Sequence, residues 1–170
     1  QKMLGQLQDA GNTTTLAHYL ELLAGAGMLK GIHKFSGKKV MQRGSSPKLQ
    51  VFNTALVSSQ SRLSYAFAKK DRDYWGRLVE SAVGAHLLNG AEGTMVEIYY
   101  WRDRGHEVDF VLQSGERTVS LEVKSGRARS DYSGMDAFAK IFQPFRKLLV
   151  GGQGIPLEGF LATPISHWVE

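Results

Sequence analysis

Cysteine is absent from the chain, which excludes disulfide bonds and any zinc site built on thiolates. The five histidines are scattered, and no two of them have the close spacing of a metal-binding pair. No apolar run reaches membrane-spanning length, and no charged-then-apolar leader opens the chain. We therefore expect no membrane partner, and the cytoplasm is the expected location.

A nucleotide-binding loop is also missing. The nearest match runs from Gly31 to Gly37-Lys38-Lys39, but five residues separate its glycines where a P-loop has four. Its last lysine stands where a P-loop needs serine or threonine to coordinate magnesium. We therefore expect no ATP site in this chain.

The net charge of +5 belongs to the first sixty residues. They hold seven Lys or Arg against Asp9 and Glu21, whereas residues 61–170 hold fourteen charges of each sign. A basic segment of this kind predicts contact with a phosphate backbone, and a solvated basic surface is the alternative. The length of 170 residues suits one domain, or one domain with a small appendage.

Residues 1–55 have a pattern of their own. Apolar residues recur at helical spacing over 16–24, which predicts an amphipathic helix of about three turns. Strand-like runs follow at 28–35 and 39–42, joined by a polar turn, and 48–52 offers a third strand. A helix followed by a basic hairpin resembles the second half of a winged helix.

The exposed face of that predicted helix has no Lys or Arg, so it is poorly suited to reading a DNA groove. Lys38, Lys39 and Arg43 in the hairpin are the expected DNA-binding residues, through phosphate contacts that position DNA without specifying sequence. The alternative role for this segment is a structural connector.

The runs Val108–Leu112 and Val119–Lys124 alternate as β-strands do, and Gly115-Glu116 between them predicts a two-residue turn. The resulting register pairs Leu112 with Val119, Phe110 with Leu121, Val108 with Val123 and Asp109 with Glu122. Every apolar pair then falls on one face, so the register is self-consistent.

Asp109, Glu122 and Lys124 fall together on the other face. Opposed residues have Cβ atoms roughly 4.5–5.5 Å apart, which is close enough for both carboxylates to bind one ion. Mg²⁺ or Mn²⁺ prefers such oxygen ligands and polarises phosphates, while a lysine beside it orients water. The alternative is a structural ion pair on a hairpin.

Glu80 is the third candidate ligand. Apolar residues at helical spacing over 71–89, an acidic start and an Asn89-Gly90 stop predict a buried helix. Glu80 lies at the border of its apolar stripe, next to small residues that allow a carboxylate to face inward. An ordinary solvated glutamate is the alternative.

The order of these elements resembles the PD-(D/E)XK nuclease superfamily, although Val108 replaces the proline of its namesake motif. Four motifs are more specifically similar to the C-terminal region of prokaryotic AAA+ family ATPases: Trp75-Gly76-Arg77-Leu78-Val79-Glu80, Tyr100-Trp101-Arg102, Glu107-Val108-Asp109-Phe110-Val111-Leu112 and Leu121-Glu122-Val123-Lys124-Ser125. In that family an ATP-binding module precedes a winged helix and a nuclease-like domain. The chain begins at Gln1, so we expect it to be part of such a longer protein.

The resemblance implies an α/β or α+β fold, with a winged-helix-like segment over 1–55 and a nuclease-like domain over 56–170. It implies a DNA-directed endonuclease-like domain that depends on Mg²⁺ or Mn²⁺ and is attached to an ATPase module. Asp109 and Glu122 are the expected metal ligands, with Glu80 as an additional or water-bridged ligand. These three and Lys124, which positions the water, are the expected catalytic residues. The alternative is a non-catalytic module of the ATPase that binds DNA or protein.

Overall fold

The computed structural model describes residues 13–37, 46–126 and 132–170. Its centre is a six-stranded sheet with the order β2-β1-β3-β4-β5-β6. The strands are β1 (Leu29–Lys34), β2 (Lys48–Val51), β3 (Val96–Asp103), β4 (His106–Ser114), β5 (Arg117–Lys124) and β6 (Arg146–Gly151). β1 runs parallel to β3 and β5 runs parallel to β6, while the other neighbours are antiparallel.

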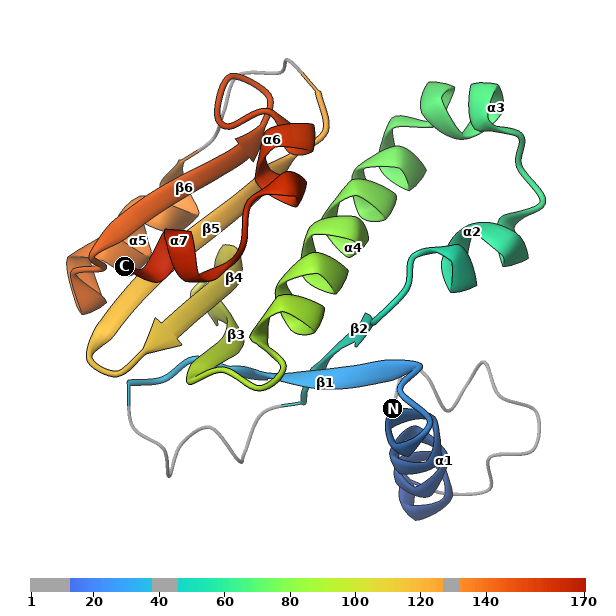
Figure 1. Cartoon of the computed structure of the whole chain (residues 1–170), viewed down its shortest axis with the longest axis horizontal. Helices are drawn as coiled ribbons and strands as arrows, with labels where there is room; N and C mark the ends of the chain where they lie inside the picture. The colour runs from blue at the N-terminus through green and yellow to red at the C-terminus, as the bar shows by residue number, and fades with distance from the viewer. Residues whose placement is uncertain (1–12, 38–45, 127–131) are drawn as a thin grey trace.

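Helices cover this sheet on both faces (Figure 1). The helices of the described residues are α1 (Thr13–Gly25), α2 (Ala55–Ser61), α3 (Tyr65–Lys70), α4 (Arg72–Ala91), α5 (Ser133–Phe142), α6 (Leu157–Ala162) and α7 (Ser166–Val169). α4, α6 and α7 cover one face of the sheet, and α5 covers the other. The predicted mixed α/β class is therefore confirmed. In the part of the chain that the structure describes, none of these helices has both the length and the apolar character needed to cross a bilayer.

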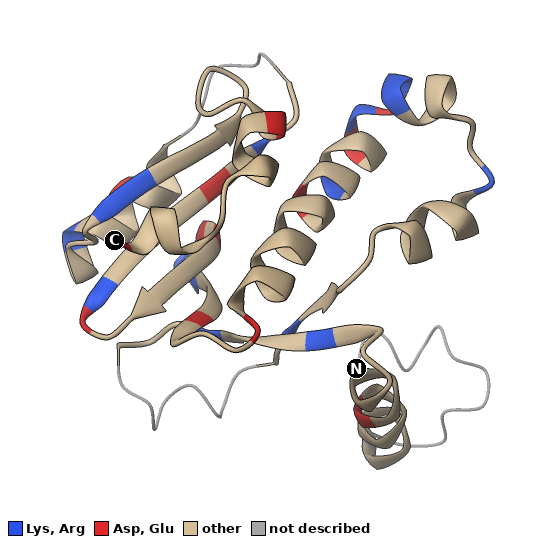
Figure 2. Cartoon of the chain, viewed as in Figure 1, with Lys and Arg blue, Asp and Glu red and all other residues tan. Residues whose placement is uncertain are grey.

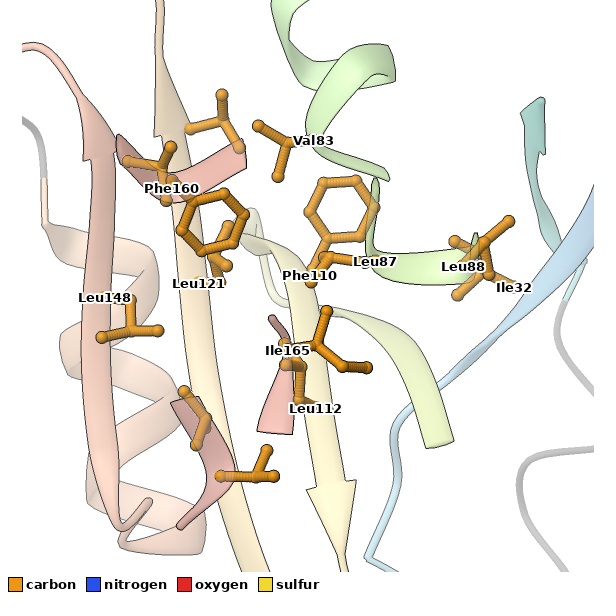
Figure 3. Close-up of a cluster of buried hydrophobic side chains, with 14 of the residues drawn as sticks. Ile32, Val83, Leu87, Leu88, Phe110, Leu112, Leu121, Leu148, Phe160 and Ile165 are labelled. Carbon is orange, nitrogen blue, oxygen red and sulfur yellow. The ribbon is translucent and has the colours of Figure 1, made fainter. Parts of the chain in front are cut away.

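Two apolar clusters hold the layers together. The larger joins α4, α6 and α7 to one face of the sheet, and Val83, Leu87 and Phe110 lie at its centre (Figure 3). The smaller packs α5 on the opposite face through Phe138 and Trp101. Burial of these side chains removes apolar surface from water and so stabilises the fold.

The helix predicted over 71–89 is α4. Asp71 caps it, because its side chain accepts the backbone N–H of Tyr74 at 3.0 Å. The helix continues two residues past the predicted stop, to Ala91. The predicted strand at 48–52 is β2, and it pairs antiparallel with β1 at the edge of the sheet. Residues 39–42, the other predicted strand of the hairpin, lie outside the described residues.

The β4–β5 hairpin has the predicted register over most of its length. Its ladder pairs Ser114 with Arg117, Gln113 with Thr118, Leu112 with Val119, Val111 with Ser120 and Phe110 with Leu121. The ladder ends there, so the predicted pairing of Asp109 with Glu122 and of Val108 with Val123 is wrong. The two strands separate at that end of the hairpin.

A β-bulge between β3 and β4 explains the difference. Tyr99 is opposite Val111 and Trp101 is opposite Val108, so three steps along β4 match two along β3. The extra residue turns Val108 into the cluster under α5, while Phe110 stays in the cluster under α4. The prediction that Val108 and Phe110 share a face is therefore wrong.

Candidate functional site

All four predicted catalytic residues line one open cleft of about 310 Å³. The cleft lies where the first turns of α4 meet the separating ends of β4 and β5. Glu80 comes from α4, Asp109 from β4, and Glu122 and Lys124 from β5. The fold therefore brings together residues up to 44 positions apart in the sequence.

Asp109 occupies the gap between the two strands. Its Oδ2 accepts the backbone N–H of Val123 at 2.8 Å, so the carboxylate takes the place of a missing ladder partner. Burial, with repulsion from Glu122 and Glu80, raises the pKa of Asp109 to about 7, although the Val123 N–H and Lys48 oppose the shift. At neutral pH this carboxyl group therefore lies near the midpoint of its titration.

Glu122 is largely buried, with 12% of its side chain accessible. Its Oε1 accepts a hydrogen bond from Lys124 Nζ at 2.6 Å. Its Oε2 is buried and, among the described residues, has no hydrogen-bond partner. Burial raises the pKa of Glu122, and the ion pair with Lys124 opposes the rise. An unsatisfied buried carboxylate oxygen is costly unless something else binds it.

Glu80 does not face open solvent, which was the alternative interpretation of this residue. It forms an ion pair with Lys48 of β2, and the two side chains are 32% and 24% exposed. Lys48 Nζ also lies 3.4 Å from the carbonyl oxygen of Asp109 and 4.9 Å from the ring centre of Phe110. Lys48 is therefore a fifth residue of the site.

The sequence offered no signal for Lys48. It lies in a run predicted to be an ordinary strand, 32 residues before Glu80. Only the placement of β2 at the sheet edge and its packing against α4 bring the ammonium to the carboxylates. Reasoning from local patterns therefore could not have selected it from the other lysines of the basic segment.

The site combines three carboxylates with two ammonium groups, a net charge of −1 when all are ionised. Oxygen-only donors suit a hard divalent cation such as Mg²⁺ or Mn²⁺, and the unpaired Glu122 Oε2 provides an available ligand atom. As placed, the described residues contain no group of three His, Cys, Asp or Glu side chains arranged to hold an ion. Lys48 and Lys124 already pair with Glu80 Oε1 and Glu122 Oε1, respectively.

The expected DNA-binding residues Lys38, Lys39 and Arg43 lie outside the described residues. The cleft has basic residues of its own, because Arg72 and Arg77 of α4 line it beside the carboxylates. Figure 2 shows Lys and Arg on α3 and on the first turns of α4. The described part of the chain thus provides a basic surface that the sequence pattern had not suggested.

One family matches the chain, over residues 75–168, and it is described as a domain of unknown function, DUF4143. The match covers more than half of the sequence and includes all of the predicted catalytic residues. Domains of this family are commonly found in proteins associated with AAA ATPases. No curated protein and no solved structure matches the chain.

Proposed function

The chain belongs to the DUF4143 family, and on that premise we propose that it is a DNA-directed, divalent-metal-dependent endonuclease-like domain of a larger AAA+ ATPase. The observation that carries this proposal is the buried Oε2 of Glu122, which lacks a hydrogen-bond partner among the described residues in a cleft shared with Asp109 and Glu80. A hard divalent cation prefers carboxylate oxygens as its ligands, so it is well suited to bind this oxygen.

In this proposal Asp109, Glu122 and Glu80 hold the ion, which would polarise a phosphate and lower the pKa of a bound water. Lys124 is already bonded to Glu122 and orients the attacking water or offsets charge on the phosphate. Lys48 holds Glu80 and limits its range of positions. Arg72 and Arg77 attract the phosphate backbone to the mouth of the cleft.

A cleavage assay tests the proposal. The purified chain is incubated with Mg²⁺ or Mn²⁺ and with single-stranded, duplex and branched DNA, beside Asp109→Asn and Lys124→Ala. Asp136→Asn is the matched control, since Asp136 of α5 forms an exposed ion pair with Lys147 of β6 and does not line the cleft. We expect cleavage by the parent and the control, and at least about a hundredfold loss in the two site variants.

Calorimetric titration with Mn²⁺ accompanies the assay. Ion binding by the parent and the control, with loss in Asp109→Asn, is the expected result. Absence of both ion binding and cleavage in the parent would refute the proposal.

A non-catalytic module of the ATPase that binds DNA or protein is the second candidate. The ion pairs Lys48–Glu80 and Lys124–Glu122 favour it, because they already neutralise two of the three carboxylates. In that case the charges would stabilise the fold, and partner binding would be the same in the parent and in the Asp109→Asn and Glu122→Gln variants.

A further inference from the structure

The short helix α3, which directly precedes α4 in the chain, exposes two aromatic rings. Tyr65 is 67% exposed and Phe67 is 66% exposed. α3 packs against α4 on the side that faces away from the sheet (Figure 1). The rings of Tyr65 and Trp75 meet edge to face, with their centres 5.7 Å apart. The two rings are two residues apart on the helix, so they point to different sides of α3, and each is accessible to a ligand.

Basic side chains surround these rings. Lys69 Nζ lies 5.6 Å from the ring centre of Tyr65, and Lys70 Nζ lies 5.9 Å from that of Phe67. Arg72 follows two residues later and lines the cleft. Basic residues therefore recur from α3 to the lining of the cleft, with Asp71 and Asp73 between them.

These cations have no acidic partner in the part of the chain that the structure describes, although Lys69 Nζ also lies 3.5 Å from the Tyr65 hydroxyl. Within residues 13–37, 46–126 and 132–170, no ion pair with Asp or Glu involves Lys69, Lys70, Arg72 or Arg77. Asp71 and Asp73 are the acidic residues of this stretch, and Asp71 is engaged as the cap of α4. The stretch from 69 to 77 keeps a net charge of +2.

We propose that α3 and the start of α4 bind an unpaired nucleic-acid strand and direct it to the cleft. We call this surface the α3 platform, and it consists of Tyr65, Phe67, Lys69, Lys70, Arg72 and Arg77. Proteins that bind single strands combine a positively charged track for phosphates with aromatic rings on which bases stack. A duplex hides the faces of its bases, so among nucleic acids only a strand with unpaired bases can stack on exposed rings.

The inference rests on the proposed function, because it specifies the form of nucleic acid that reaches the same cleft. An apolar protein partner would fit the two rings but would leave four cations desolvated without counter-charges. The phosphates of a strand supply those charges. Stacking on rings is tolerant of base identity, so the platform is not selective for sequence.

Fluorescence anisotropy with a labelled oligothymidine and with a duplex of equal length tests this inference. The measurements use the full chain in EDTA, so that metal-dependent cleavage does not contribute. The variants are Phe67→Ala, Phe67→Leu and the double variant Lys70→Ala/Arg77→Ala. Phe145→Ala is the matched control. Phe145 is 48% exposed, and its ring centre lies 4.9 Å from the guanidinium carbons of Arg117 and Arg146. It is at the end of the β5–β6 pair that is remote from the cleft.

We expect the parent to bind the single strand more tightly than the duplex. Phe67→Ala should weaken single-strand binding about 5- to 150-fold without changing its salt dependence, which corresponds to the removal of one base stack. Phe67→Leu should weaken it too, because leucine keeps apolar bulk but has no ring. The double cation variant should lower the slope of log K against log salt by about 0.7 for each phosphate that it no longer neutralises.

Binding of the single strand that is unchanged in Phe67→Ala, or equally weakened in Phe145→Ala, would overturn the inference. So would full binding by Phe67→Leu, which would indicate a purely apolar interaction, or preference for the duplex. These results can be told apart from a failure of the nuclease proposal. If the chain binds the single strand in EDTA but does not cleave DNA in Mn²⁺, only the nuclease proposal is refuted. If it cleaves DNA but does not bind the single strand, only the α3 platform is refuted.

Discussion

Asp109 is the residue whose acid–base chemistry the fold changes most. In the unfolded chain an aspartate titrates near pH 3.9, whereas burial and the neighbouring carboxylates raise the pKa of Asp109 to about 7. The folded state therefore holds this proton more tightly than the unfolded state. The stability from this residue is fully present below about pH 4 and is lost as the pH rises through about 7.

The pH dependence of unfolding tests this linkage. Asp109→Asn keeps an acceptor for the Val123 N–H but cannot ionise. Between about pH 5 and pH 8 we expect the parent to lose on the order of 2 kcal/mol more unfolding free energy than Asp109→Asn. Urea titrations in EDTA measure the difference, with Asp136→Asn as an exposed control. Parallel pH profiles for the parent and Asp109→Asn would contradict the raised pKa.

At the scale of elements, the packing of α4 on β2 depends on one glycine. A Cβ on Gly84 would lie 2.3 Å from Gln50 Oε1 and 2.8 Å from the ring of Phe110. Gln50 cannot easily move, because its amide nitrogen donates to the carbonyls of Val51 and Ser81 at 2.9 Å. The same packing positions Lys48, two residues earlier in β2, beside Glu80.

Two alanine substitutions in this one helix should have opposite effects. Gly84→Ala should reduce the unfolding free energy by about 1–3 kcal/mol, because the added methyl group overfills the space between α4 and the sheet. Gly76→Ala should raise it by about 0.5–1 kcal/mol, since its Cβ would meet only Ser125 Oγ at 3.4 Å and alanine favours helix. Chemical denaturation measures both. Equal changes in the unfolding free energy would show that helix propensity, and not packing, determines the effect of alanine at these two positions.

At the scale of the whole molecule, the site exists only in the folded chain. Its carboxylates and lysines come from four elements, β2, α4, β4 and β5, that are separated along the sequence. A ligand that binds all of them at once binds the native state and not the unfolded chain. Ion binding should therefore raise the stability of the entire fold.

Thermal unfolding with added Mn²⁺ should reveal this coupling. At an ion concentration about 100 times the dissociation constant, we expect about 2.7 kcal/mol of stabilisation in the parent, reversed by EDTA. Glu122→Gln should lose most of the shift, whereas Glu116→Gln, in the exposed turn of the same hairpin, should keep it. A shift of equal size in Glu122→Gln would place the ion elsewhere.

The sequence by itself was sufficient to predict the hairpin from Phe110 to Leu121, the span of α4 within two residues and the carboxylates that meet in the cleft. These features follow from periodicity and turn chemistry, which depend on residues close together in the chain. A repeat of about two or 3.6 residues predicts which side chains share a face wherever the strand or helix is regular.

Only the tertiary structure decided how the site is completed. The bulge against β3 turned Val108 to the other face and freed Asp109 to accept the Val123 N–H. In the sheet, β2 lies at the edge next to β1, and β1 lies next to β3. This order brings Lys48 of β2 to Glu80. Both outcomes depend on interactions between segments that are distant in the sequence. The energies of these interactions come from packing and burial, which cannot be predicted from the local sequence pattern.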